Sequence, residues 1–233
     1  LRRDNDSMFG ENHKWGNFPG VSAGWTISNE EFMNGAKGWL SNMKLRAGWG
    51  MAGIMPDLSS EAYATYEANQ DLHWETSKEV NIGLDLGFFG NRLYANIDLY
   101  EKVTSGMVWG YSVAASPTLY NLIANAGSMS NQGIEVLIGG TPVQTKNFEW
   151  NSTLTLAHNR NKLLSMSNDL YETEDYLDGG WTEEPTSMVT QRTYIGDAIG
   201  TFYMLKSVGV VPDGPKKGLW LIEDPETGEA VSF

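Results

Sequence analysis

The chain of 233 residues contains no cysteine, which excludes disulfide bonds and thiolate metal sites. Basic residues are also few: 16 Lys and Arg stand against 29 Asp and Glu, giving a net charge of −13. Such a surface repels phosphates, so we expect no nucleic-acid partner. No run of eighteen apolar residues is present, which excludes a transmembrane helix. The first ten residues lack the apolar stretch of a signal peptide.

Side chains that carry catalysis are equally scarce. The three histidines, His13, His73 and His158, lie far apart in the sequence and share no metal-ligand spacing. The sequence contains no G-x-S-x-G motif, no P-loop and no G-x-G-x-x-G that opens a helix. We therefore expect no enzyme activity and no histidine metal centre. His158 falls on the apolar side of its expected strand.

Glycine and aromatic residues are plentiful instead, with 26 Gly, 9 Trp and 10 Tyr, a balance typical of β-proteins. The clearest pattern is residues 73–103, HWETSKEVNIGLDLGFFGNRLYANIDLYEKV. Apolar and polar residues alternate along both halves, which indicates two strands because successive side chains point to opposite faces. Gly90-Asn91 between them suits a tight primed turn, so the stretch predicts a β-hairpin.

Similar alternation predicts further strands before and after this hairpin, at residues 18–28, 39–50, 132–141, 148–159 and, less regularly, 199–211. The expected connections alternate in length. They are short at residues 29–40, 90–91 and 141–147, and long at 4–16, 52–72, 109–128 and 161–198. An up-and-down antiparallel meander with short turns at one rim and long loops at the other has this pattern, as in outer-membrane barrels.

Two all-β architectures are compatible with the pattern. A soluble sandwich also alternates apolar and polar positions. The barrel is favoured because the polar faces carry small uncharged residues, such as Ser22, Gly24 and Thr26, and because aromatic residues gather near the strand ends, as in membrane girdles. Carboxylates on the polar face are expected to pair with nearby cations; the carboxylates are Glu79, Asp85, Asp98, Glu135 and Glu149, and the cations are Lys44, Arg46, Arg92 and Lys102.

An ordered series of stretches resembles the SusC/RagA-type TonB-dependent receptors of the Bacteroidetes outer membrane. The stretches are RRDNDSMFGENHKWGNFPGVSAGWTISNEEFM, WLSNMKLRAGWGMAG, LHWETSKEVNIGLDLGFFGNRLYANIDLYEKVTSGMV, NAGSMSNQGIEVLIGG, FEWNSTLTLAHNRNKLLSM and IGDAIGTFYMLKSVGV. The series covers nearly the whole chain in order. The resemblance implies an all-β antiparallel up-and-down meander that is part of a large transmembrane β-barrel, and barrels of 22 strands with a plugged lumen are known.

The resemblance further implies import of a nutrient, an oligosaccharide or a peptide, across the cell outer membrane. It implies a SusD-like surface lipoprotein as partner and energy from the TonB complex, contacted through an N-terminal region. We expect residues 1–233 to be one partial barrel segment, without the plug, signal peptide and C-terminal strands of the family. The alternative function is a soluble all-β glycan-binding module of a surface or secreted protein.

Aromatic residues in the expected long loops are the candidate substrate-binding residues: Trp109, Tyr111, Tyr120, Tyr171, Tyr176 and Trp181. Flat rings beside Asn and Asp suit sugar or peptide recognition, and the alternative explanation is loop packing or contact with a partner lipoprotein. We expect no cofactor. The acidic residues of 169–184 form either a solvated loop surface or a Ca²⁺ site, and Asp4-Asn5-Asp6 is a poor calcium loop because Met8 stands where Asp or Asn is needed.

Overall fold

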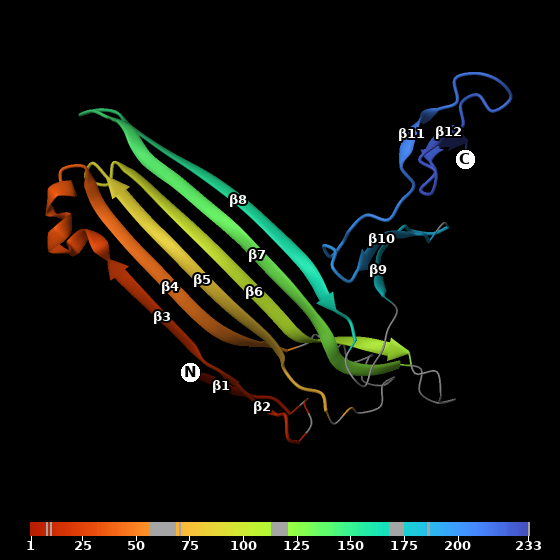
Figure 1. The fold of residues 1–233 in the computed structure, drawn as a ribbon, viewed down its shortest axis with the longest axis horizontal. Helices are drawn as coiled ribbons and strands as arrows, with labels where there is room; N and C mark the ends of the chain where they lie inside the picture. Colours follow the sequence, from red (N-terminus) through yellow and green to blue (C-terminus); the bar gives the residue numbers. More distant parts are fainter. Residues whose placement is uncertain are drawn as a thin grey trace. The chain divides into compact units, whose positions relative to one another are not determined.

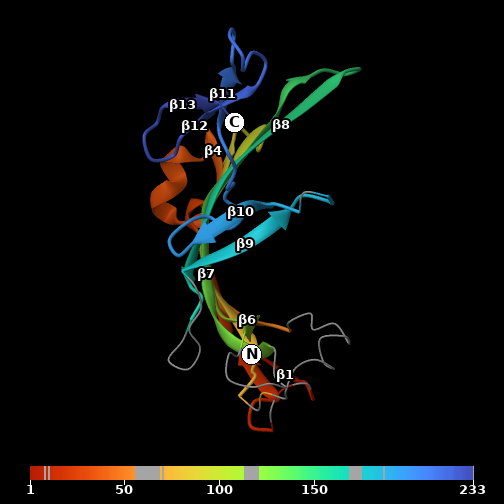
Figure 2. The same ribbon diagram turned by 90° about the vertical axis from the view of Figure 1, so that its right-hand side faces the viewer.

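Six long antiparallel strands form the main sheet of the computed structural model, which describes residues 1–7, 9, 11–55, 69, 71–112, 121–167, 175–185 and 187–232. The order is β3-β4-β5-β6-β7-β8, so each strand pairs with its neighbour in sequence. Figure 1 shows them side by side, and Figure 2 shows the sheet curving when seen edge-on. The bounds are β3 Gly20–Thr26, β4 Leu40–Ile54, β5 Glu75–Phe88, β6 Leu93–Ser112, β7 Asn121–Gln144 and β8 Glu149–Ser165.

The remaining elements are short. β1 (Arg2–Asn5) pairs with β2 (Trp15–Phe18), and the 3₁₀ turns η1 (Ile27–Asn29) and η2 (Glu31–Ala36) link β3 to β4. β9 (Tyr176–Trp181) pairs with β10 (Val189–Tyr194), and β11 (Ser207–Val210), β12 (Trp220–Glu223) and β13 (Ala230–Ser232) form a three-stranded sheet. No helix among the described residues is long and apolar enough to cross a membrane. The chain divides into two compact units, one of residues 1–175 with 195–198 and one of residues 176–194 with 199–233.

The expected turn of the central hairpin is confirmed. Phe89, Gly90 and Asn91 have φ values of +54°, +69° and +63°, so the chain reverses through left-handed residues that include the Gly-Asn pair. The backbone N–H of Arg92 donates to the carbonyl oxygen of Phe89 across this turn, and Phe88 pairs with Leu93. Glycine and asparagine tolerate positive φ better than other residues, so the dipeptide determines where the chain reverses.

The strands are longer than the alternation predicts. The expected loop at residues 109–128 is wrong in extent, because β6 continues to Ser112 and β7 already begins at Asn121. Gly106, at φ +65°, lies in a register shift between Ser105 and Val108, and this irregularity interrupts the period of two. The expected loop 161–198 likewise contains the end of β8 and the β9–β10 hairpin, and of the strand expected at 199–211 only Ser207–Val210 forms.

Buried apolar side chains gather at the end of the sheet that carries the long connections. Phe9, Phe18 and Leu72 are buried there, and the ring of Trp74 lies 4.9 Å from that of Phe9 and 5.7 Å from that of Phe18. The indole N–H of Trp74 donates to the carbonyl oxygen of Lys14 over 3.3 Å. This cluster attaches the β1–β2 hairpin to the start of β5.

Candidate functional site

One face of the six-stranded sheet is polar, and cross-strand register aligns its residues in rows. Lys44 lies opposite Asp85 and then Asn96, while Arg46 lies opposite Gly83, then Asp98 and Glu135. Neighbouring strands place such partners about 5 Å apart, within reach of long side chains. Pairing alone therefore brings charged groups from β4, β5, β6 and β7 onto one surface.

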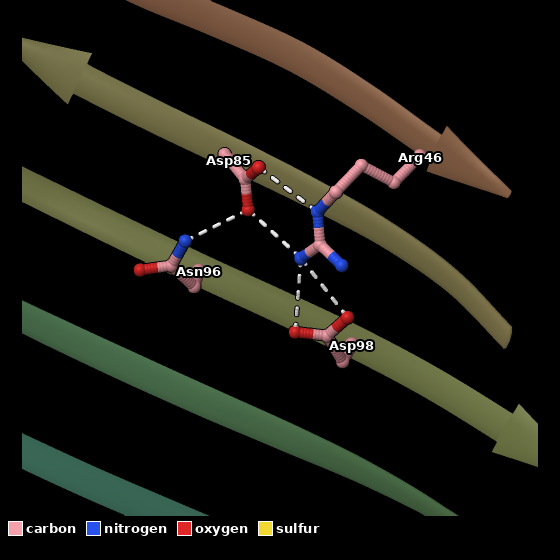
Figure 3. A network of polar contacts seen from close by, with 4 residues as sticks. All are labelled: Arg46, Asp85, Asn96 and Asp98. Atoms are coloured by element: carbon pink, nitrogen blue, oxygen red, sulfur yellow. Dashed lines mark hydrogen bonds and ion pairs between the residues drawn. The ribbon is translucent and has the colours of Figure 1, made fainter. Parts of the chain in front are cut away.

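Arg46 on β4 joins two carboxylates on two different strands (Figure 3). Its Nε and Nη2 donate to both carboxylate oxygens of Asp85 on β5, over 2.9 and 2.8 Å. Nη2 also donates to Asp98 on β6 over 3.2 Å, with a shortest ion-pair distance of 3.0 Å. Asn96 Nδ2 donates to Asp85 over 2.7 Å. The expected pairing of polar-face charges is confirmed for Arg46, Asp85 and Asp98.

Gly83 makes this bridge sterically possible. A Cβ atom at Gly83 would lie 2.5 Å from Arg46 Cζ and 2.6 Å from Asp98 Oδ1, so the guanidinium crosses β5 over the bare backbone of the glycine. Other large side chains of the polar face also lie over a glycine of the neighbouring strand: the ring of Tyr94 lies over Gly139 and that of Tyr100 over Gly133. The result is a flat wall of ring faces, amides and carboxylates that can hydrogen-bond a solute.

The opposite face of the sheet is apolar and exposed. Ile82, Leu99 and Ile134 form one row across β5, β6 and β7, and Leu84, Ile97, Val136 and Leu156 form the next. Ile82 keeps 49% and Leu156 56% of its side-chain surface exposed. The band ends at a polar row of Glu101, Gln132 and Arg160, and His158 lies in the last row before it, on the apolar face as expected.

Aromatic residues mark the edges of the apolar band, as the sequence predicts. Trp39 stacks on Phe88 at the short-turn end, with ring centroids 6.0 Å apart and planes 11° apart. Trp49 lies opposite Val80 at the other boundary. The exposed aromatic residues of this kind are Trp25, Trp39, Trp49, Phe89, Phe148 and Trp150. Rings at both edges of an apolar band match the two girdles of a membrane barrel.

Of the six candidate binding aromatics, Trp109, Tyr176 and Trp181 have described side chains. Tyr120 and Tyr171 lie outside the described residues, as does the side chain of Tyr111. Trp109 is a strand residue of β6 and not a loop residue; it packs on Ala124 and Ala126, and its ring lies over Gly127. Its indole N–H is buried without a hydrogen-bond partner among the described residues, so packing accounts for this tryptophan.

Tyr176 and Trp181 belong to the second unit, on strand β9. Trp181 is 64% exposed. The guanidinium carbon of Arg192 lies over two aromatic rings, 3.9 Å from the ring centroid of Tyr176 and 4.4 Å from that of Tyr203. Arg192 also donates to both oxygens of Asp178, over 2.6 and 2.9 Å. These bonds lower the pKa of Asp178 and raise that of Arg192, so both stay charged.

Candidate metal ligands are arranged differently from the sequence expectation. No group of three or more His, Cys, Asp or Glu lies together within the described ranges. Asp4 pairs with Arg2 and Asp178 with Arg192, while Asp169, Glu172 and Glu174 fall outside the described residues. However, His13 and His73, which are distant in sequence, have ring centroids 5.7 Å apart. No spacing in the sequence signals this approach.

Comparison with known proteins decides the family. Residues 1–211 match the family described as TonB dependent receptor-like, beta-barrel. The chain belongs to this family. It is 33% identical over 227 residues to the TonB-dependent receptor P39 of Formosa agariphila, covering 90% of this chain and 20% of that protein. It is 28% identical to the TonB-dependent receptor SusC of Bacteroides thetaiotaomicron, covering 89% of this chain and 23% of that protein.

Solved structures give the same fold. The RagAB peptide importer in its closed-closed state matches with a TM-score of 0.76 and 24% identity, covering 99% of this chain and 26% of that chain. The RagAB peptide transporter matches with a TM-score of 0.73 and 23% identity, covering 97% of this chain and 26% of that chain. The TonB-dependent receptor chain described here thus spans about a fifth to a quarter of the length of its relatives.

Membership of the family gives each face of the sheet its role. The six strands are an antiparallel, up-and-down part of a large transmembrane β-barrel. In such a barrel the apolar face contacts lipid and the polar face lines the interior. Figure 1 shows the connections β3–β4, β5–β6 and β7–β8 at one end of the sheet. The expected alternation in loop length holds only in part, because the strand bounds leave 20 residues between β4 and β5 but eight between β6 and β7, fewer than the 13 between β3 and β4.

Proposed function

We propose that this chain forms part of the wall of a TonB-dependent outer-membrane importer that takes up an oligosaccharide or a peptide. It has no catalytic role in this proposal. Its polar face lines the path of the solute, and its apolar face is anchored in the lipid. A SusD-like surface lipoprotein binds the solute at the outer mouth, and the TonB complex supplies energy through a part of the receptor outside these residues.

The observation that carries the proposal is the exposed apolar band that crosses β3 to β8. From Phe88 to Val80 it runs eight residues along β5, which is about 27 Å at roughly 3.4 Å per residue. With a strand tilt of about 40°, its height is roughly 20 Å, close to the ~25 Å band of outer-membrane barrels. A soluble protein rarely leaves so large an apolar face uncovered, because it causes association.

The polar face supports passage of polar, uncharged or zwitterionic solutes. Among the described ion pairs of this face, Arg46 neutralises one of its two carboxylate partners, so the surface is polar without being strongly charged. Tyrosine rings over glycines give flat apolar surfaces beside hydrogen-bonding amides, which suits sugar rings and peptide planes equally. RagAB is a peptide importer, and the relationship to it supports the peptide alternative.

The aromatic residues predicted from the sequence fit a binding role to different degrees. In this proposal Trp181, with its exposed ring, contacts solute or lipoprotein, as do Tyr111, Tyr120 and Tyr171. Tyr176 holds Arg192 and therefore acts by positioning. Trp109 supports the packing of β6 on β7. Substrate class is decided by growth of a strain that lacks the receptor, supplied with either oligosaccharides or peptides as the required nutrient.

The membrane position of the wall is tested with spin labels. The chain has no cysteine of its own, so Ile82→Cys and the neighbouring Asn81→Cys, made in the full-length receptor, each give one labelling site within this segment. In lipid vesicles we expect the label at position 82 to be relaxed by oxygen, which partitions into lipid, and the label at position 81 by a water-soluble nickel chelate. Equal exposure of both labels to the chelate would contradict the proposal.

A further inference from the structure

The rings of His13 and His73 lie side by side although β2, β3 and β4 separate the two residues in sequence. His13 lies in the connection between β1 and β2, and His73 lies just before β5. Their ring centroids are 5.7 Å apart, with planes inclined by 45°. Lys14 directly follows His13, and Trp74 directly follows His73. The indole N–H of Trp74 donates to the carbonyl oxygen of Lys14. The two segments are therefore held together independently of the imidazoles.

His73 is held in one orientation by its own hydrogen bonds. Its backbone N–H donates to Asn125 Oδ1 over 3.0 Å, and Asn125 Nδ2 donates back to its carbonyl oxygen over 2.7 Å. Its ring Nδ1 lies 2.9 Å from the carbonyl oxygen of Asp71. A carbonyl oxygen only accepts, so Nδ1 carries the proton and, in the neutral ring, Nε2 carries the lone pair. Metal-binding histidines are oriented in this way, with the other ring nitrogen donating to a backbone carbonyl.

Space is available around this lone pair. His73 is exposed and His13 half-buried. Gly106 has φ +65°, and a Cβ atom there would lie 3.3 Å from His73 Nε2. Glycine at this position therefore keeps side-chain atoms away from the nitrogen that a metal ion would contact.

The separation of the rings fits two ligands of one ion. A metal–nitrogen bond of about 2.0–2.1 Å places an ion roughly 3.2 Å from each ring centroid, and a tetrahedral angle then puts the centroids about 5.2 Å apart. The observed 5.7 Å differs from this value by an amount that a small rotation of the exposed ring removes. We propose that His13 and His73 together bind one divalent transition-metal ion of the Zn²⁺, Cu²⁺ or Ni²⁺ class, for which imidazole is a preferred ligand.

Within the part of the chain that the structure describes, these two imidazoles are not joined by a third His, Cys, Asp or Glu. Water or a donor group of a bound molecule completes the coordination, which leaves the ion open to exchange. The bound ion links the β1–β2 hairpin to the start of β5 at the end of the sheet that carries the long connections. This inference depends only on the two imidazoles and stands apart from the transport proposal.

The test is histidine modification by diethyl pyrocarbonate in the purified full-length receptor, treated first with a chelator and read out by peptide mass spectrometry at neutral pH. Addition of Zn²⁺ is expected to protect His13 and His73 together, with the labelling of His158 unchanged as the internal reference. Mg²⁺ is expected to protect none of the three. In the His13→Ala variant, Zn²⁺ is expected no longer to protect His73 from modification. In the His73→Ala variant, Zn²⁺ is expected no longer to protect His13.

Three outcomes would overturn the proposal: no protection by Zn²⁺, equal protection of His158, or protection of His73 that persists without His13. Cu²⁺ spectroscopy gives a second reading that does not depend on labelling. The electron paramagnetic resonance spectrum of bound Cu²⁺ is expected to show coupling to two imidazole nitrogens in the parent receptor and to one in the His13→Ala and His73→Ala variants. The same nitrogen count in all three proteins would also contradict a shared ion.

Discussion

Replacing Arg46 with methionine is expected to destabilise the barrel wall by about 2 kcal/mol. Methionine keeps much of the side-chain volume and removes the charge, so Asp85 and Asp98 are left as two unneutralised carboxylates on neighbouring strands. Removing one partner of a fully buried ion pair costs about 3–5 kcal/mol, whereas an exposed pair contributes about 0–1 kcal/mol. Here the side chains of Arg46, Asp85 and Asp98 are 33%, 20% and 26% exposed, which places the cost between these limits.

The assay is urea unfolding of the full-length receptor in lipid vesicles, followed by tryptophan fluorescence. A loss of about 2 kcal/mol lowers the ratio of folded to unfolded receptor roughly 30-fold. Asp98→Asn is expected to be nearly neutral, because Arg46 keeps both bonds to Asp85 and one negative charge disappears. Asp85→Asn is expected to lie between the two. Arg160→Met, on the opposite face of the sheet, is the matched control. An unchanged midpoint for Arg46→Met, or a larger effect of Asp98→Asn, would refute the reasoning.

Three further perturbations test other features of the fold. Gly83→Ala is expected to lower the free energy of unfolding about as much as Arg46→Met does, because the new Cβ displaces the guanidinium of Arg46. If the double variant is no less stable than Arg46→Met alone in the same assay, the two substitutions act through one shared interaction. Trp109→Phe is expected to be tolerated, since it removes an N–H that has no partner among the described residues. Trp109→Ala should cost about 3 kcal/mol through the cavity that it leaves, and equal losses for the two variants would contradict this. Asp178 has its pKa lowered, so its contribution to the β9–β10 hairpin is present at neutral pH and is lost as pH falls through the lowered pKa. Protection of the amides of residues 176–194 against hydrogen exchange, taken relative to the intrinsic rate at each pH, should therefore fall in acid, and Asp178→Asn should remove that dependence.

The main features of the sheet could be predicted from the sequence because a strand has only two faces. Once Val80, Ile82 and Leu84 are assigned to one side, Asn81, Gly83 and Asp85 must lie on the other. The Gly90-Asn91 turn then determines the register of the hairpin, since few other dipeptides tolerate two positive φ values. Local chemistry was therefore sufficient for the direction, pairing and polarity of these strands.

Other features could not be predicted because they depend on irregular or distant partners. The register shift around Gly106 interrupts the alternation of apolar and polar residues along β6 and β7. The paired ends of these strands therefore lack the period of two that identifies a strand in the sequence. The Arg46 bridge to Asp98 requires a glycine on the intervening strand, which is visible only after the strands are aligned. The approach of His13 to His73 depends on the packing of Trp74 against the β1–β2 segment, a contact between residues far apart in sequence.

The continuation of β6 and β7 past the apolar band has a mechanical consequence. From Glu101 to Ser112 the strand runs eleven residues further, a length of about 36 Å at roughly 3.3 Å per residue. Pairing along this length makes the extension stiffer than a single unpaired strand, so its own residues are held in a fixed arrangement beyond the apolar band. Residues held in this way have less conformational freedom to lose on binding than those of an unpaired chain, so contacts made with the extension cost less entropy.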